Sequence, residues 1–525
     1  MGILVYISPM PEQDNLRGEV PLFSRREFLT RSALAAAAPL ILPAFRGRPL
    51  ELGTEVDVPI LPDDLLRHWP ALLLQIPPQQ STTEVDFKAD FGAVGDGNYN
   101  DMPAFQELAN AINAERIPPY SVVNIPEGVY RMIGDERVTI NKPVILRGEG
   151  PSKTTLRPEY TSQNTFFLVV SGARSYVRHS TGIYAGTQDT NRYPNVPFSP
   201  IENEPSRGDL SIAASRPGLF SQGDYGYVLC DDYGPEIVHA PNNRRSKHFL
   251  LKQHVQIESV DGSDITFDIP LRQNFSGASP RLYRWEPVRG FGLEHMTIDD
   301  RSIIAESRAL TTFTSVLLDG TTYSWVWDVH FTNNTSIPLH LYRSRKTIVC
   351  ESLFNDAKYQ GEGGNGYLPQ LHLCDDCLVE YSTSIGGRHA LICNATSWGN
   401  VFRYNRVIGT QNIETHGEYN LENLYFRNSA GQSRLEIGGG GSGTHAHDGP
   451  YNQFRENFGL VFNILKRADE ANSIIDNWSV RGIQDSGVNT LKQGNSQIPK
   501  NWRAFPFEQF CGHDHTETAE IARPN

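Results

Sequence analysis

A nine-residue, strand-like phrase recurs through the second half of this 525-residue chain. FGLEHMTID, TIVCESLFN and NVFRYNRVI are three of its copies, and the third position of every copy is apolar. Successive copies start 33, 23, 30, 23, 23, 29 and 21 residues apart. The copies begin at Phe291, Ser324, Thr347, Cys377, Asn400, Asn423, Asn452 and Ser473. A shared minimum of about 22 residues with longer excursions is typical of stacked coils whose extra residues form loops.

The composition of the copies predicts strands. Each copy is short and rich in apolar residues, and polar corners of Asn, Gly and Ser follow it. These features favour a β-solenoid over a helical repeat. We therefore expect an all-β chain that forms a parallel β-helix, with each coil buried on the next. Rows of side chains along the faces of such a fold suit a linear polymer as ligand.

The charge of the chain limits its partners. Lys and Arg number 47 against 60 Asp and Glu, which gives a formal net charge of −13. This balance argues against a nucleic-acid partner, which needs a basic footprint.

The N-terminus predicts export. Ser24-Arg25-Arg26-Glu27-Phe28-Leu29 and the apolar run 33–44 resemble a twin-arginine signal. The segment 1–48 holds six Arg and four acidic residues, so its removal leaves a net charge of about −15. The apolar run is short for a spanning helix, so we expect a periplasmic or extracellular protein with no membrane span in the mature chain. A buried helix behind two surface arginines is the alternative.

Six cysteines would permit disulfides in an exported protein. Cys374, Cys377 and Cys393 either stack in the core or belong to a zinc site. No fourth ligand stands at a zinc-like spacing nearby, so we expect core stacking.

Changes in pattern divide the chain into segments. An α-helix is expected from Met102 to about Ala114, with Asp101 as N-cap and Pro103 in its first turn. The stretch 248–272 alternates apolar and polar residues around an Asp261-Gly262 hairpin signal. The expected segments are a signal at 1–48, a linker or arm at 49–80, an N-terminal cap with the first coils at 81–157, a β-rich insertion at 158–285, coils at 286–485 and a cap or tail at 486–525.

The motifs ADFGAVGDG, AFQ, IPEGVY and LRGEG, all within Asp86–Arg157, resemble the opening of the pectate lyase superfamily. Rhamnogalacturonases and uronan epimerases share such an opening. The resemblance implies a single-stranded, right-handed parallel β-helix with an N-terminal capping helix, here carrying a β-rich insertion. It implies a polysaccharide partner and does not fix the reaction, because the superfamily includes lyases, hydrolases, epimerases and phage tailspikes. Asn100-Asp101 replaces the usual acidic pair at the helix start, and we assign these two residues to capping.

Histidines recur at matching places in the coils. Five of them precede a copy of the phrase by five or seven residues, namely His340, His372, His416, His445 and His447. Around His340 and His372, alternation directs the neighbouring leucines inward and the histidines outward. We therefore expect a histidine column along one face, with Arg388-His389 on an intervening coil. A polar ladder that only satisfies hydrogen bonds is the alternative.

The densest part of this column supplies groups for β-elimination on a uronic acid. That reaction needs a group to neutralise the C5 carboxylate, a base for the C5 proton and an acid for the leaving oxygen. Arg388 suits the first role, His416 or His389 the second and Tyr419 the third. The predicted catalytic residues are Arg388, His389, His416, Glu418 and Tyr419, and the predicted substrate-binding residues are His340, His372, His445, His447 and Arg427.

Two other functions stay open. A glycoside hydrolase would use two carboxylates about 5–10 Å apart. The candidates for them are Glu362, Asp375, Asp376, Glu414, Glu418, Glu436 and Asp448. A β-helix that binds a glycan without cutting it is the third reading. No protein metal ligands are predicted, and calcium is left open as a cofactor.

Overall fold

The computed structural model describes residues 69–76, 83–134, 136–160, 166–172, 197–230, 251–275, 280–302, 313–361, 364–417, 419–438, 447–465, 472–485 and 491–497. All structural statements below refer to these residues. The expected export signal lies outside them, as do Glu418, His445 and Cys511.

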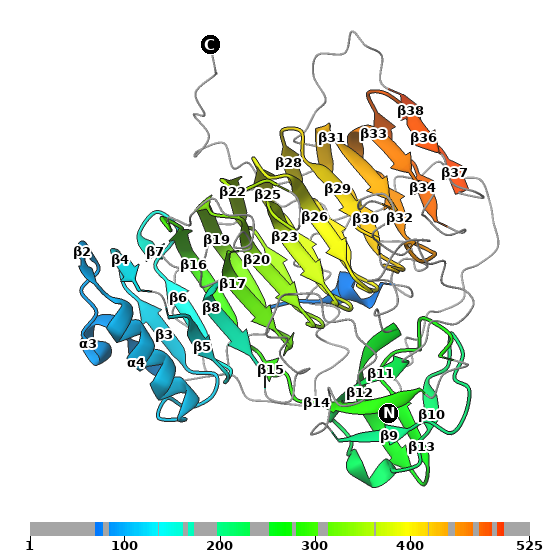
Figure 1. Cartoon of the computed structure of the whole chain (residues 1–525), viewed down its shortest axis with the longest axis horizontal. Coiled ribbons are helices and arrows are strands. Elements are labelled where there is room, and N and C mark those ends of the chain that lie inside the picture. Colours follow the sequence, from blue (N-terminus) through cyan, green and yellow to red (C-terminus); the bar gives the residue numbers. More distant parts are fainter. Residues whose placement is uncertain are drawn as a thin grey trace, which may run out of the picture. The chain divides into compact units, whose positions relative to one another are not determined.

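The chain forms a right-handed parallel β-helix, as predicted (Figure 1). Its strand pairings run along the coils as three parallel sheets. Sheet 1 contains β5 (Val138–Ile140), β8 (Phe166–Ser171), β17 (Thr314–Asp319), β20 (Ile337–Tyr342), β23 (Tyr367–His372), β26 (His389–Asn394), β29 (Asn412–Thr415), the ends of β31 (Ser429–Ile437) and β33 (Phe458–Ile464), and β36 (Ile483–Asp485).

Sheets 2 and 3 complete each coil. Sheet 2 contains β1 (Glu84–Asp86), β3 (Val122–Ile125), β6 (Ile145–Gly148), the starts of β16 (Gly292–Asp299) and β19 (Trp325–Asn334), β21 (Ile348–Cys350), β24 (Leu378–Glu380), β27 (Val401–Arg403), β30 (Leu424–Phe426), β32 (Gln453–Arg455), β34 (Ser473–Ile475) and β37 (Leu491–Gln493). Sheet 3 contains β2 (Asp96–Asn100), β4 (Gly128–Ile133), β7 (Thr154–Glu159), the ends of β16 and β19, β22 (Leu353–Ala357), β25 (Thr383–Ile385), β28 (Arg406–Ile408), the starts of β31 and β33, β35 (Trp478–Ser479) and β38 (Ser496–Gln497).

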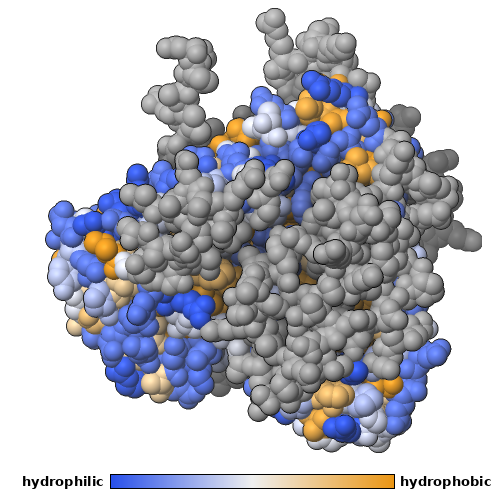
Figure 2. Space-filling model, in the orientation of Figure 1, coloured by the Kyte–Doolittle hydropathy of each residue, from blue (hydrophilic) through white to orange (hydrophobic). Residues whose placement is uncertain are grey.

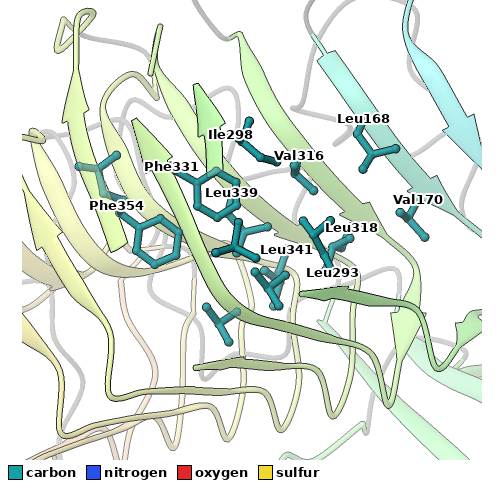
Figure 3. Packing of buried hydrophobic residues seen from close by; sticks show 14 of the residues in the cluster. Leu168, Val170, Leu293, Ile298, Val316, Leu318, Phe331, Leu339, Leu341 and Phe354 are labelled. Carbon is teal, nitrogen blue, oxygen red and sulfur yellow. The ribbon is translucent and has the colours of Figure 1, made fainter. Parts of the chain in front are cut away.

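The inward side chains of the three sheets form one continuous core (Figure 3). Leu339 and Leu341 of β20 are buried there beside Phe331 and Phe354 of sheet 3. The two phenyl rings stack with their centroids 5.2 Å apart. Burying a Leu or Phe side chain contributes about 1.5–3 kcal/mol. Removing one of these rings would therefore open a void shared by two coils.

The recurring phrase covers the sheet 2 strand and the first residues of the sheet 3 strand, and its apolar third positions in sheet 2 stack in register. The stack passes through Leu293, Val326, Val349, Val379, Phe402, Tyr425 and Phe454. The last copy was placed one residue late, because Phe454 pairs with Ile474 rather than Ile475.

Two asparagine ladders set this register. The backbone N–H of each Asn donates to the side-chain oxygen of the Asn one coil further on. The last copy therefore begins at Asn472, the position equivalent to Asn452. One ladder contains Asn400, Asn423, Asn452 and Asn472, and the other contains Asn405, Asn428, Asn457, Asn477 and Asn495.

Cysteines 374, 377 and 393 lie in the core, and all three are free thiols. The thiols of Cys374 and Cys377 contact the backbone carbonyl oxygens of Leu341 and Ser344, respectively, on the preceding coil. Their stacking in the core agrees with the first of the two readings.

A helix covers the N-terminal end of the core. This helix, α4 (Met102–Asn113), follows the short helix α3 (Phe87–Phe91) and buries Phe105, Leu108 and Ile112 in the core. Asp101 is the N-cap residue, but its side chain does not cap the helix. Its carboxylate instead accepts hydrogen bonds from the backbone of Val94 and Gly95 at 2.7 and 3.2 Å, fixing the preceding turn.

The described surface over the N-terminal coils is mainly hydrophilic where it is visible in Figure 2. Exposed aromatic residues of this region, such as Tyr99 and Tyr120, are scattered singly. Single apolar residues of this kind are normal on a protein surface and indicate no docking patch.

The insertion forms an antiparallel sheet. Two short 3₁₀ turns are also described, one in the N-terminal arm and one in the insertion. The strands are β9 (Phe198–Pro200), β10 (Ser211–Ala213), β11 (Tyr225–Cys230), β12 (Leu251–Asp261), β13 (Asp264–Phe267) and β14 (Arg281–Trp285), and the turns are η1 (Pro70–Leu73) and η3 (Pro217–Leu219). A further pair joins β15 (Val288–Arg289) to β18 (Thr321–Thr322). The β12–β13 hairpin turns at Gly262, as its sequence signal predicts.

Two expected boundaries need correction. β8 lies in the range assigned to the insertion but pairs with β5 and β17 of sheet 1. β37 and β38 continue the coils beyond residue 485. β8 was missed because it belongs to sheet 1, which the recurring phrase does not cover. β37 was missed because Lys492, and not an apolar residue, stands in register with Ile474.

Candidate active site

The outward face of sheet 1 carries a band of polar side chains. Leu339, Leu341 and Leu371 point into the core, as alternation predicts. His340 and His372 lie on the opposite side of the sheet, yet they are only 1% and 2% exposed. The histidines therefore belong to a buried polar layer rather than to an open column.

The histidines also do not form a straight column. His340 pairs in register with Gln370, and Tyr342 pairs with His372. The two imidazoles are thus offset by two residues, with ring centroids 5.6 Å apart. The sequence contains the reason, because His340 precedes its phrase by seven residues and His372 by five.

His389 of β26, Glu414 of β29 and His416, which comes directly after β29, form a compact group. The Nδ1 atom of His416 lies in hydrogen-bond contact with Oε1 of Glu414. The Nδ1 atom of His389 lies 3.2 Å from the same oxygen. The two imidazole centroids are 5.4 Å apart, so two rings converge on one carboxylate.

A bulge lies next to this group. β26 and β29 shift register between Ala390 and Cys393, and Leu391 has a positive φ of 50°. His416 follows the end of β29, and its ring lies beside that of His389 at the start of β26.

Tyr367 of β23 joins the group from the preceding coil. Its hydroxyl lies 3.2 Å from Nε2 of His416, and its ring centroid is 4.9 Å from that of His389. The guanidinium of Arg388 lies 6.0 Å from the Tyr367 ring centroid and donates to the backbone oxygen of Gly361 at 2.7 Å. A hydroxyl, an imidazole and a carboxylate are thus connected in that order.

Glu436 lies on the next coil, in register with Glu414. Asn463 donates to Oε1 of Glu436 at 2.7 Å. Burial, reinforced by the charge of Glu414, raises the pKa of Glu436. Glu436 is therefore the weaker acid of the two neighbouring carboxyl groups.

Protonation within the cluster follows from burial and pairing. Burial lowers the pKa of His389 to about 4. Burial alone would raise the pKa of Glu414, but His416 and His389 lower it to about 2. Glu414 is thus an ionised carboxylate near neutral pH, and His389 is a neutral imidazole.

The structure separates the other predicted site residues from this group. Tyr419 packs with Trp398 and Leu421 against the insertion. Arg427 pairs with Glu456 at 2.7 Å beside a sheet 2 strand. The backbone oxygen of His447 accepts from the N–H of Tyr419. Predictions for Glu418 and His445 lie outside the described residues.

Sequence reasoning missed Tyr367. Its signal is spacing, because Tyr367 precedes His389 by 22 residues and the two are register partners. Alignment on the sheet 2 phrase hid this relationship, since the number of residues between sheets 1 and 2 varies from coil to coil.

Asp375 and Asp376, two of the candidate hydrolase carboxylates, form ion pairs with residues of the insertion. Asp375 pairs with Lys252 at 3.0 Å and with His254 at 2.7 Å. Asp376 pairs with Arg272 at 2.5 Å. Both carboxylates are fully buried and hold the insertion on a corner of the coils.

Within the described residues, the only group of His, Cys, Asp or Glu side chains able to hold a metal ion is His389, Glu414 and His416. Its three ligand atoms lie within 4.8 Å of one another. Two nitrogens and one oxygen do not suit calcium, which binds six to eight oxygens.

No protein-family model matches the chain, and no curated protein matches its sequence. Solved structures share its fold at low identity. The Gp54 tailspike of Acinetobacter baumannii bacteriophage AP22, in complex with A. baumannii capsular saccharide, has a TM-score of 0.50 and 11% identity over 80% of this chain and 67% of that one. The gp61 tailspike of Pseudomonas phage phi297 has a TM-score of 0.43 and 12% identity over 80% and 76%.

A 1,3-α-1,4-β-D-galactose-4-sulfate-3,6-anhydro-D-galactose-2-sulfate 4 galactohydrolase has a TM-score of 0.41 and 12% identity, covering 81% of this chain and 93% of that one. The similarity to the Gp54 tailspike agrees with the parallel β-helix fold. None of the helices in the described part is long and apolar enough to cross a membrane.

Proposed function

We propose that this protein is an exported polysaccharide lyase that cleaves a uronic-acid-containing glycan by β-elimination on the outward face of sheet 1. The observation that carries the proposal is the connected set Tyr367, His416 and Glu414. In this set a carboxylate orients an imidazole, and the imidazole reaches a phenol hydroxyl. Such an arrangement activates a weak acid as a proton-transfer group.

The proposed reaction uses Tyr367 twice. Nε2 of His416 accepts the phenol proton, and Glu414 stabilises the resulting imidazolium. The phenolate then removes the C5 proton of the uronate, the C4–C5 double bond forms and the C4–O bond breaks. The leaving oxygen takes the proton from Tyr367, so one chain becomes two without addition of water.

Arg388 is the residue proposed to face the substrate carboxylate. It is partly exposed and lies beside Tyr367, whose ring its guanidinium approaches at 6.0 Å. A local cation is needed because the net charge of the chain repels a polyanion.

Hydrolysis is the second candidate, favoured by Glu414 and Glu436. They are register partners, and Glu436 is the one whose pKa is raised. Adjacent parallel strands lie about 4.8 Å apart, close to the separation of about 5–5.5 Å in retaining glycosidases. Against this reading, both histidines converge on Glu414 and leave it poorly placed to attack a sugar.

The superfamily and the route of export are part of the proposal. The N-terminal motifs support membership of the pectate lyase superfamily, and the twin-arginine pattern supports secretion. The parallel β-helix is compatible with both.

Product analysis of an acidic-glycan panel tests the reaction. Lysis yields unsaturated uronates that absorb in the ultraviolet, hydrolysis yields reducing ends alone, and a non-catalytic binder yields neither. Tyr367→Phe is expected to lower kcat by at least about 100-fold. Tyr404→Phe is the matched control, because Tyr404 stacks on Tyr381 next to sheet 2. Full activity of Tyr367→Phe would exclude the proposed role.

A further inference from the structure

We propose that His389, Glu414 and His416 bind a divalent transition-metal cation, such as Zn²⁺ or Mn²⁺, through the two Nδ1 atoms and the Glu414 carboxylate. The site itself stands on geometry alone. Its suggested role, drawing the substrate carboxylate to sheet 1, rests on the proposed function.

The spacing of the ligand atoms suits a metal. Ligands about 2.1 Å from a tetrahedral ion lie roughly 3.4 Å from one another. The Nδ1 atom of His389 lies 3.2 Å from Oε1 of Glu414, and all three ligand atoms fall within 4.8 Å. A small movement of the side chains would place all three around one ion.

His389 supplies an independent observation. It is 5% exposed, and neither ring nitrogen has a hydrogen-bond partner among the described residues, because its contact with Glu414 lacks hydrogen-bond geometry. A buried polar group without a partner costs about 1–3 kcal/mol. Hydrogen bonding therefore accounts for His416 but leaves His389 without a role, whereas a metal ion would use the Nδ1 lone pair.

The ligand set selects the class of metal. Two imidazoles and one carboxylate favour first-row transition metals over Ca²⁺ and Mg²⁺, which prefer oxygen. Nε2 of His416 lies 3.2 Å from the Tyr367 hydroxyl, an outer contact of the kind that fixes the orientation of a metal-binding imidazole.

A metal on Nδ1 of His416 would leave the single imidazole proton on Nε2, which could donate to the Tyr367 oxygen but could not accept the phenol proton. In the metal-loaded protein the phenol proton would therefore pass to solvent instead of His416, and the charge of the metal would stabilise the phenolate. A fourth coordination position could take the carboxylate of the substrate and offset the acidic charge of the chain.

The test measures binding without any glycan. The folded protein is dialysed against a chelator and titrated by calorimetry with Zn²⁺, Mn²⁺, Ca²⁺ and Mg²⁺. We expect one Zn²⁺ or Mn²⁺ per chain, a metal-dependent rise in Tm and no saturable Ca²⁺ binding. His389→Ala should abolish this binding.

His340→Ala is the matched control, because His340 is another buried histidine on the same face but outside the cluster. It should keep the metal. If neither transition metal binds, or if His389→Ala binds as well as the wild type, the metal site is excluded. Glycan lysis by metal-free protein would overturn the catalytic role of the metal and leave the proposed function standing. Metal binding without lysis of any acidic glycan would support the metal site and contradict the proposed function.

Discussion

Lys252 of the insertion and Asp375 of the coils form a fully buried ion pair, with 3.0 Å between Nζ and Oδ2. His254 adds a backbone and a ring contact to the same carboxylate, at 2.8 and 2.7 Å. Burial alone would raise the pKa of Asp375, but Lys252 and His254 lower it. A stretch 121–123 residues distant in sequence thus supplies the counter-charge at this corner.

Asp375→Ala should strongly destabilise the protein. It leaves Lys252 buried without its partner, a change that costs about 3–5 kcal/mol in other buried pairs. Urea unfolding followed by tryptophan fluorescence measures the effect. Arg116→Ala is the control, because its pair with Glu107 is exposed, and it should leave the unfolding midpoint unchanged. Equal midpoints for the two variants would show that the buried pair does not stabilise the fold.

Asn428→Ala should interrupt an asparagine ladder. The Asn428 side chain accepts two hydrogen bonds from Asn405 and donates one each to Phe402 and Asn457, at 2.9–3.0 Å. Their loss is expected to cost roughly 2–4 kcal/mol in the free energy of unfolding. Asn98→Ala, at an exposed turn, is the control, and a similar change in Tm for both would contradict the structural role of the ladder.

His340 should make the fold sensitive to acid. Burial lowers the pKa of its imidazole from 6.5 to about 3. Between these values the unfolded chain binds a proton that the folded protein does not, so stability falls as pH decreases through this window. His340→Leu should reduce the slope of unfolding free energy against pH by about 1.4 kcal/mol per unit between pH 6 and 4. Parallel pH profiles for variant and wild type would refute this.

Arg388→Ala should impair catalysis while leaving the fold intact. Its side chain is partly exposed, and its one described hydrogen bond goes to a loop carbonyl. We expect kcat/KM on an acidic glycan to fall by about 10–100-fold and Tm to change by no more than a few degrees. Arg406→Ala, on the exposed surface of sheet 3, should retain activity. Loss of activity in both variants would indicate a general charge effect.

Glu436→Gln separates the two candidate reactions. In the elimination mechanism Glu436 takes no part in proton transfer, so activity should stay within about threefold of wild type. In hydrolysis it would be the acid, and the amide would reduce turnover by at least about 100-fold. Steady-state rates on the same glycan decide the matter, with Asn463→Ala as a control for the lost hydrogen bond.

Most of the fold could be predicted from the sequence. The apolar third positions from Leu293 to Phe454 stack as their spacing predicts, because parallel strands in stacked coils repeat the same inward positions. The one-residue error at Asn472 arose because an asparagine ladder, not the apolar pattern, fixes that register. Asp101 likewise stands at the helix start as predicted, but its carboxylate binds the turn before it.

Only part of the candidate site could be predicted from the sequence. The sequence directed attention to His389 and His416 and to the outward face, because alternation determines which side of a strand a residue occupies. It paired them with Tyr419 instead of Tyr367. Side chains from different coils meet only after corner lengths and the bulge at Leu391 have fixed which residues lie opposite each other.

The sequence by itself determined the coil, its core and its polar face, since these depend on local alternation and on a repeat that each coil carries within itself. Only the tertiary structure decided that two imidazoles converge on Glu414 and that Lys252 neutralises Asp375. Those contacts depend on register between coils and on the docking of a distant sheet. Neither leaves a periodic signal along the chain.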